Sequence, residues 1–273
     1  MAGSRANWLT PRVLQWLAAF ERGRVLHVFE RSANLVDERG KVLSIVDPEI
    51  GPGPFNLVLS QPFEFQEKLR PDAAVEVATV LRVGGLTVSW SGAKVWDPVP
   101  PWRSIAAEHL PGMIAALEAE MSVSPVRPAI GFDPPPDPAD EGALAAYGRS
   151  LAGFGPGLTP SGDDVLMGLA HAFFVRFPAE QAAAFARVLA EGAAQRTTTL
   201  SAAWLRSAAA GEAGILWHQL IEAAAGGSER EIRRVVTRIQ QVGHTSGADA
   251  ISGFLEGIRS RPGVRSRRSI CPG

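Results

Sequence analysis

The stretch from Gly153 to Gly168, GFGPGLTPSGDDVLMG, brings together residue types that bind small anions and move protons. Its hydroxyl, glycine and carboxylate residues stand directly before an apolar run with the composition of a buried helix. A helix N-terminus carries unpaired N–H donors and partial positive charge, which favour an anion. We therefore expect a small carboxylate or phosphate to bind here, at Thr159, Ser161 and Gly162.

The two adjacent carboxylates of this stretch have different expected roles. Ser161 and Asp164 have the spacing of a capping box, in which each side chain accepts a hydrogen bond from a free backbone N–H. Asp163 has no such duty, which makes it a candidate catalytic residue. Asp163 and Asp164 are also a tentative site for Mg²⁺, although neighbouring residues on a helix point about 100° apart and make a poor joint chelate.

A near-repeat of this motif lies close to the end of the chain. The sequence SGADAISG, Ser246 to Gly253, matches SGDDVLMG in its Ser, its first Gly, its second Asp and its final Gly. Unless the likeness is chance, two helix N-termini of one design face the same ligand. We expect anion contacts from Thr245, Ser246 and Gly247, and His244 is a second candidate catalytic residue, for proton transfer.

Simpler interpretations of several of these residues stay open. Asp249 fits a plain helix cap, and Ala248 replaces Asp163 in the second copy, so only the first copy offers a carboxylate without a capping role. His244 also fits a polar loop residue. His171 lies within an apolar helical pattern, which is typical of a hydrogen-bonded core histidine.

A third segment, QRTTTLSAAWLRSAAAG, again opens a helix with hydroxyl residues: Thr197 or Thr198 is the expected cap, and both are expected to contact the anion. Arg196 precedes them and would form a fork for a carboxylate or phosphate, or else be an ordinary surface residue. We expect the three motif-bearing helix starts to meet in one pocket, because polar entrances buried separately would lack partners. Asn56, in the upstream segment GPGPFNLVL, is expected at the rim of that pocket.

The residue composition and its periodicity change along the chain. Residues 1–100 read as a β-rich domain with an N-terminal helix, because short Val- and Leu-rich runs alternate with Gly, Pro, Asp and Asn. Residues 101–260 read as an Ala-rich α-helical domain that carries the glycine motifs, and residues 261–273 as a disordered tail. The expected fold class is α+β, with a barrel- or sandwich-like half followed by a helical bundle.

Composition excludes several classes of function. The 273 residues carry 27 basic and 28 acidic side chains, so no overall field favours nucleic acid or a membrane surface. The single cysteine fits a reducing compartment, and the cytoplasm is the expected location. Dinucleotide, P-loop and zinc motifs do not occur, and Ser161 does not lie in a GxSxG elbow.

The three glycine- and hydroxyl-rich segments, in this order and with GPGPFNLVL upstream, resemble the bacterial family that includes the AllH-type subunit of oxamate carbamoyltransferase. The similarity spans roughly Val25 to Ile258. It implies purine-degradation chemistry of the allantoin pathway: phosphorolysis of oxalurate to oxamate and carbamoyl phosphate, carried out with other subunits. The resemblance assigns no catalytic residues, and family members outside that pathway are expected to act on other small carboxylates.

Two classes of function follow from the sequence. The first is an enzyme subunit of the carbamoyl-transfer type, or a related enzyme that acts on a small carboxylate. The second is a non-catalytic partner that binds a small anion and scaffolds or regulates another subunit. A helix-terminus anion site serves both classes, so the motifs alone do not separate them.

Overall fold

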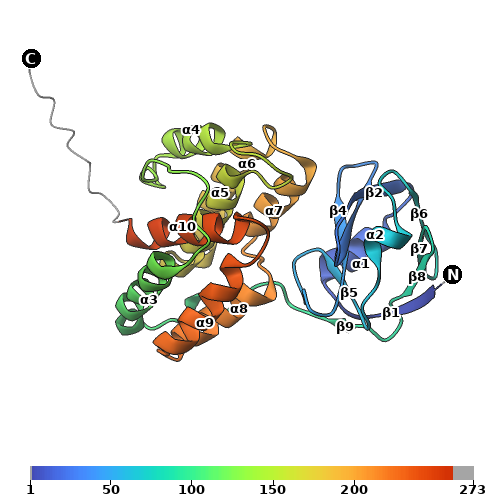
Figure 1. Ribbon diagram of the computed structural model, residues 1–273. Coiled ribbons are helices and arrows are strands. Elements are labelled where there is room, and N and C mark those ends of the chain that lie inside the picture. The colour runs from blue at the N-terminus through green and yellow to red at the C-terminus, as the bar shows by residue number, and fades with distance from the viewer. Residues whose placement is uncertain (1, 261–273) are drawn as a thin grey trace, which may run out of the picture.

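The computed structural model describes residues 2–260, in which a strand-rich lobe precedes a helical lobe (Figure 1). The strands are β1 (Ala2–Leu9), β2 (Gly23–Val28), β3 (Ser32–Asp37), β4 (Val42–Val46), β5 (Asn56–Leu59), β6 (Ala74–Val77), β7 (Leu81–Val83), β8 (Leu86–Ser89) and β9 (Lys94–Val95). The helices are α1 (Pro11–Ala18), α2 (Phe65–Lys68), α3 (Leu110–Val123), α4 (Glu141–Leu151), α5 (Ser161–Arg176), α6 (Ala179–Ala194), α7 (Thr199–Ala209), α8 (Ile215–Ala225), α9 (Glu229–Gln240) and α10 (Ser246–Arg259). The fold is α+β, as the sequence predicts.

The strand-rich lobe is an eight-stranded barrel. Its strands follow the order β5-β4-β3-β2-β6-β7-β8-β1, and β1 closes the ring by pairing antiparallel with β5. Strand β9 adds to β1 in parallel. The interior is filled by aliphatic side chains that are fully buried, among them Leu35, Leu43, Ile45, Leu57, Leu81 and Leu86. Closure removes free sheet edges, which decides between the barrel and sandwich alternatives.

Strand β1 is the main element that the sequence patterns did not predict. The segment AGSRANWL lacks the Val- and Ile-rich composition of a strand, and its partners β5 and β8 lie far along the chain. Thr10 then caps α1 by accepting a hydrogen bond from the N–H of Val13, with Pro11 at the first helical position, as expected.

Helix α5 is the centre of the helical lobe. Every residue of α5 except Met167 and Arg176 is buried, as expected for a helix that is apolar on all faces. His171 is one of these buried residues: its ring stacks on Trp102, and its Nε2 lies 3.3 Å from the carbonyl oxygen of Glu212. Burial lowers the pKa of His171 to about 3, so it is the neutral core histidine that the sequence suggests.

Helices α5 and α10 pack against each other at two glycines. A Cβ atom on Gly168 would lie 1.8 Å from the carbonyl oxygen of Ala250, and one on Gly253 would lie 2.0 Å from that of Val165. These contacts are related by the near-repeat, because Gly168 aligns with Gly253 and Val165 aligns with Ala250. The sequence likeness therefore reflects two similar helices that share one close crossing.

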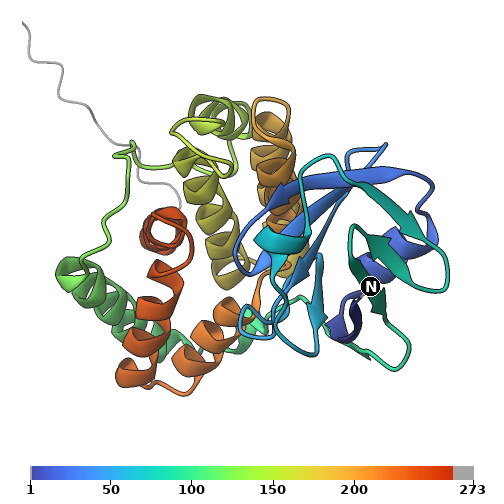
Figure 2. The ribbon, with the colours of Figure 1, turned by 45° about the vertical axis from the view of Figure 1, so that its right-hand side comes forward.

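The two lobes meet along α7 and α8 (Figure 2). The ring of Phe55, beside β5, lies 4.5 Å from the ring of Trp204 on α7, and Val42 and Leu200 complete this small apolar cluster. The N–H of Ile215, at the start of α8, donates to the carbonyl of Pro52 at 3.0 Å. Backbone pairing and apolar packing thus both join the barrel to the helices.

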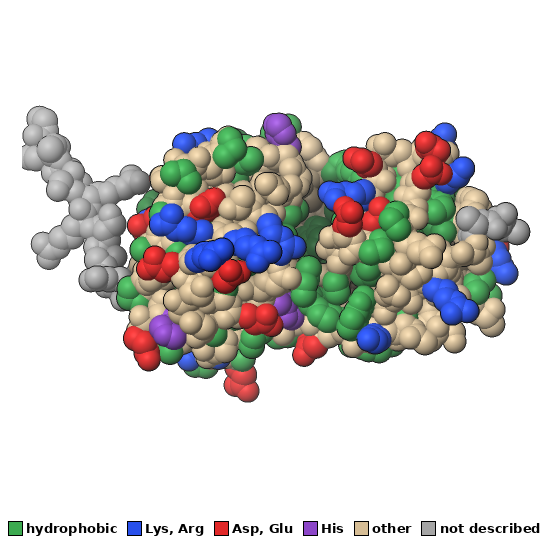
Figure 3. Space-filling view, turned by 60° about the horizontal axis from the view of Figure 1, so that its bottom comes forward, with side chains coloured by type: hydrophobic (Ala, Val, Ile, Leu, Met, Phe, Trp, Pro, Cys, Tyr) green, Lys and Arg blue, Asp and Glu red, His purple; other side chains and the backbone are tan. Residues whose placement is uncertain are grey.

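On the outer surface, α9 buries Ile232, Val235, Val236 and Ile239, and its arginines face solvent. Figure 3 shows Lys and Arg side chains gathered over the helical lobe on this face. The basic side of this segment is a solvated helix face. Among the described residues, none of the helices combines the length and apolar character required to cross a membrane. The tail expected over residues 261–273 lies outside the described residues.

Replacing either crossing glycine with alanine should destabilise the protein. We expect Gly168→Ala and Gly253→Ala each to lower the free energy of unfolding by about 1 to 3 kcal/mol or more, because the new methyl group would overlap backbone that cannot easily move. Urea denaturation measures the change. Gly142→Ala in α4 is the matched control, because a Cβ there makes only an ordinary 3.5 Å contact, and this variant should be neutral or slightly stabilised. Equal effects at all three positions would contradict the close crossing.

Candidate functional site

The three motif-bearing helix starts meet at one junction, formed by the N-termini of α5, α7 and α10. The Thr159 hydroxyl lies 3.0 Å from the Ser246 hydroxyl, which joins the loop before α5 to the start of α10. Thr198, the N-cap of α7, donates its hydroxyl to the carbonyl of Leu158 at 2.7 Å and accepts from the N–H of Ser201. The three helix starts therefore lie together, as predicted, and Thr198 is the cap that the sequence suggests. The pocket expected there stays a prediction.

Hydrogen bonds to Asp163 join α5 to the two neighbouring segments of the junction. One carboxylate oxygen accepts from the N–H of Gly153 at 3.0 Å, and the other accepts from the Thr197 hydroxyl. The Ser201 hydroxyl lies beside the same group. Burial raises the pKa of Asp163, and these three donors oppose the shift by stabilising the charged form. Asp163 thus has a structural duty that the sequence did not reveal.

Asp164 and Asp249 are the buried carboxylates contributed by the two copies of the repeat. Burial raises the pKa of Asp164 to about 8; the charges of Asp249 and Asp163 act in the same direction, and the Ser246 hydroxyl opposes them. Asp164 is 6% exposed, and its Oδ2 has no hydrogen-bond partner within residues 2–260. Asp249 accepts from the N–H of Ala129 at 2.8 Å through Oδ1, and its Oδ2 is likewise unpartnered in the described chain. Burial therefore favours the protonated form of Asp164.

The expected side-chain caps of α5 and α10 are wrong. The N-cap of α5 is Pro160, and that of α10 is Thr245, and neither makes a side-chain capping bond. Turns close both helix starts instead: the N–H of Gly162 donates to Phe154 at 2.9 Å, and that of Gly247 donates to Val242 at 3.1 Å. Both glycines lie against a preceding helix, where a side chain would not fit. Their N–H groups are thus already bonded, which weakens the case for them as anion donors.

The side chains of the remaining predicted site residues make no hydrogen bond to the carboxylates of the junction within residues 2–260. Arg196 and His244 are exposed, and neither side chain has a hydrogen bond or ion pair within residues 2–260. Asn56 is buried at the end of the barrel, where its amide donates to the carbonyl of Gly51 at 3.1 Å. None of the hydrogen bonds in the described chain joins Asn56 to the junction. Ala129, the partner of Asp249, comes from a proline-rich segment with no motif that marks it.

The carboxylates do not converge as a metal site. Asp163 points to Gly153 and Thr197, whereas Asp164 lies beside Ser246 and Asp249. Within residues 2–260, no group of three or more His, Cys, Asp or Glu side chains is placed to hold a metal ion. Mg²⁺ at Asp163 and Asp164 stays a prediction.

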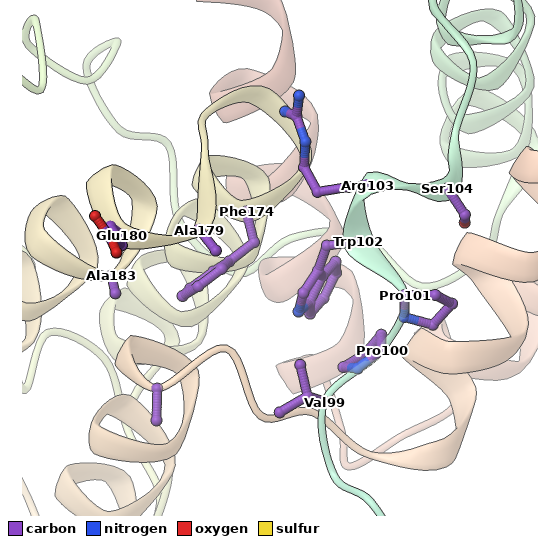
Figure 4. Close-up of a pocket in the computed structure, with 11 residues that line it drawn as sticks. Val99, Pro100, Pro101, Trp102, Arg103, Ser104, Phe174, Ala179, Glu180 and Ala183 are labelled. Atoms are coloured by element: carbon purple, nitrogen blue, oxygen red, sulfur yellow. The ribbon is translucent and has the colours of Figure 1, made fainter.

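An apolar surface hollow lies elsewhere. It measures about 590 Å³ and is lined mainly by Val99, Pro100, Pro101, Trp102, Phe174 and Ala183 (Figure 4). These side chains come from the connection between the lobes, from the C-terminal half of α5 and from the N-terminal half of α6. None of the residues predicted for the site lines this hollow.

Comparison with protein families identifies the chain. Residues 151–258 match the family described as oxamate carbamoyltransferase subunit AllH, and residues 5–95 match the AllH family N-terminal domain. The chain belongs to the AllH family. The first match covers α5, α7 and α10, so the whole junction lies in the segment characteristic of AllH, and the second covers most of the barrel. Comparisons with curated proteins and with solved structures gave no match.

We expect Asp163 to contribute to the stability of the fold, although the sequence suggests no structural role for it. We expect Asp163→Ala to lower the free energy of unfolding by about 1 to 3 kcal/mol, because it leaves the Gly153 N–H and the Thr197 hydroxyl without their acceptor. Thermal or urea denaturation tests this. Asp133→Ala, at an exposed carboxylate without a side-chain partner in the described chain, is the control. Unchanged stability in Asp163→Ala would show that these bonds contribute nothing.

Asp164 should make the stability of the protein depend on pH. In the unfolded chain this carboxyl loses its proton near the ordinary pKa of 3.8, but in the folded protein it keeps the proton until about pH 8. Its contribution to stability therefore falls as pH rises between these values and levels off above them. Asp164→Asn removes this penalty, so the variant should gain stability relative to wild type as the pH rises from 4 to 8. Urea denaturation across that pH range measures the difference, with Asp133→Asn as the control. If the stability of both variants changed with pH in the same way, the raised pKa of Asp164 would be refuted.

Proposed function

We propose that this AllH-family chain is a subunit of an oxamate carbamoyltransferase-like enzyme, which converts oxalurate and phosphate into oxamate and carbamoyl phosphate. The observation that carries the proposal is the buried carboxyl group of Asp164, which lies beside Ser246 at the junction and has an oxygen without a hydrogen-bond partner within residues 2–260. The family membership supports the subunit role, and Asp164 supplies a group suited to the proton transfer that this reaction requires.

The reaction needs a proton at the leaving nitrogen. A phosphate oxygen attacks the carbamoyl carbon of oxalurate, the bond from that carbon to the nitrogen of the oxamate half breaks, and this nitrogen must gain a proton as it leaves. Asp164 holds a proton at neutral pH, and its pKa of about 8 lies near the operating range that general acids require. The proton released by hydrogen phosphate would then restore the acid.

Reaching Asp164 requires movement of the loop above it. The segment between α4 and α5 carries Gly153, Gly155 and Gly157, each with φ between 70° and 109°, conformations that glycine adopts without strain. This loop is joined to the N-terminus of α5 by the hydrogen bond from the Gly153 N–H to Asp163, and to the N-terminus of α10 by the contact between the Thr159 and Ser246 hydroxyls. Its displacement would expose the acid to a substrate, and glycines at such positions suit a hinge.

Exposed apolar side chains beside the junction support assembly with other subunits. Phe154 is 56% exposed, Leu158 39% and Val242 50%. All three lie on the two loops that the Thr159–Ser246 contact joins. Phe154 and Val242 also occupy corresponding turns, because each accepts the hydrogen bond from the first glycine of its motif. A partner that covered these side chains would also exclude water from the acid.

The proposal is tested by turnover in the assembled complex. We expect Asp164→Asn to lower the rate of carbamoyl phosphate formation from oxalurate and phosphate by about 100-fold or more, because the amide keeps the shape of the protonated acid but transfers no proton. Subunit assembly, followed by size-exclusion chromatography, should be unchanged. Asp133→Asn should turn over like wild type.

Full turnover in Asp164→Asn would remove the catalytic role of the junction. The alternative function, a non-catalytic subunit that binds a small anion and scaffolds or regulates its partners, would then be favoured. If Asp164→Asn instead prevented assembly of the subunits, the non-catalytic alternative would also be favoured, because the junction would then serve contacts between subunits.

A further inference from the structure

A second, smaller cavity lies between the barrel and α7, and it is cationic. It measures about 340 Å³, within the range of pockets that hold small molecules. Its charged lining residues all carry positive charge: Arg12 of α1, Arg39 and Lys41 of the turn between β3 and β4, and Arg206 of α7. Four cations from three separate elements converge here, although the protein as a whole is close to neutral.

Two of these cations are neutralised and two are not. Arg12 pairs with the half-buried Glu212 at 2.8 Å, and Arg39 pairs with the exposed Glu21 at 2.9 Å. Lys41 and Arg206 form no ion pair within residues 2–260. The cavity therefore presents two uncompensated positive charges, one from each lobe.

The floor of this cavity offers hydroxyl and aromatic groups. Ser207 is 1% exposed, lies beside the Glu212 carboxylate, and has no acceptor or donor at hydrogen-bonding geometry for its hydroxyl in the described chain. The buried rings of Trp16 and Phe55 line the same space, and Trp16 is held by a hydrogen bond from its indole N–H to the carbonyl of Lys41. That bond fixes the backbone that carries the ammonium group. The lining thus combines a rigid apolar floor with charged donors and one spare hydroxyl.

We infer that this cavity binds a compact anion, either inorganic phosphate or a small carboxylate such as oxamate. Lys41 and Arg206 hold its charge from opposite lobes, and Ser207 donates a hydrogen bond from the floor. The guanidinium fork of Arg206 matches a carboxylate or phosphate edge, whereas the ammonium of Lys41 acts as a point charge. A bound anion would bridge the barrel and the helical lobe. This site is separate from the α5–α7–α10 junction and does not depend on the carbamoyl-transfer proposal.

Isothermal titration calorimetry of the full-length chain tests the site without any turnover. Phosphate and oxamate are titrated separately at low ionic strength, and saturable binding of either supports the inference and identifies the source of the anion. Lys41→Ala and Arg206→Ala should each weaken that binding about ten-fold or more, because each removes a charge-assisted hydrogen bond.

Arg233→Ala is the matched control, because Arg233 is an exposed helical arginine on α9 without an ion pair in the described chain. Its affinity should equal that of wild type. Thermal denaturation without ligand checks that all variants fold, since Lys41 and Arg206 are exposed and their loss should leave the melting temperature nearly unchanged. Absence of binding by wild type to both anions, or equal weakening in Arg233→Ala and the cavity variants, would overturn the inference.

Discussion

Gly168 and Gly253 let α5 and α10 approach until the backbone of each touches the other, and the rest of the helical lobe depends on this contact. The two helices run in the same direction, because Ser246 lies beside Asp164 at one end, and Gly257 packs on Ala172 further along. Their N-termini must therefore end together. The polar residues that open each helix are brought to one junction by apolar packing elsewhere in the pair.

This arrangement explains the electrostatics of the junction. Helix N-termini attract carboxylates, so Asp163, Asp164 and Asp249 all occupy first turns. Burying several like charges together is costly, and the structure limits this cost in two ways. Asp163 receives donors from Gly153 and Thr197, whereas burial favours the protonated form of Asp164, which has fewer donors. The region in which the sequence predicts an anion site thus contains three buried carboxyl groups in the fold.

The sequence predicts those features that depend on local pattern. Short Val-rich runs between turn residues mark the region from β2 to β8, and Ala-rich periodic segments mark the helices, because neighbouring residues carry these signals. The run over residues 74–83 reads as one strand but forms two, β6 and β7. Strand β1 was not predicted because its pairing partners, β5 and β8, lie far along the chain and leave no local pattern. The capping box of Ser161 and Asp164 was wrong because the Asp164 N–H, from which the Ser161 side chain was expected to accept a hydrogen bond, donates to the carbonyl of Pro160 at 3.2 Å. Arg196 has the right chemistry for an anion site, but nothing in its neighbourhood determined where its side chain would point.

Helix α7 connects the acid junction to the cationic cavity. Ser201 lies beside Asp163 near the start of α7, and Arg206, on the cavity, follows five residues later, a rise of about 7.5 Å along the helix axis. Five residues correspond to about 500° of helical rotation, so Ser201 and Arg206 project from different sides of α7. A single helix thus fixes the spacing between the junction and the cavity. Because α7 also packs against Phe55 of the barrel, any shift of one lobe relative to the other would change the shape of the cavity and move the helix that supports the acid junction.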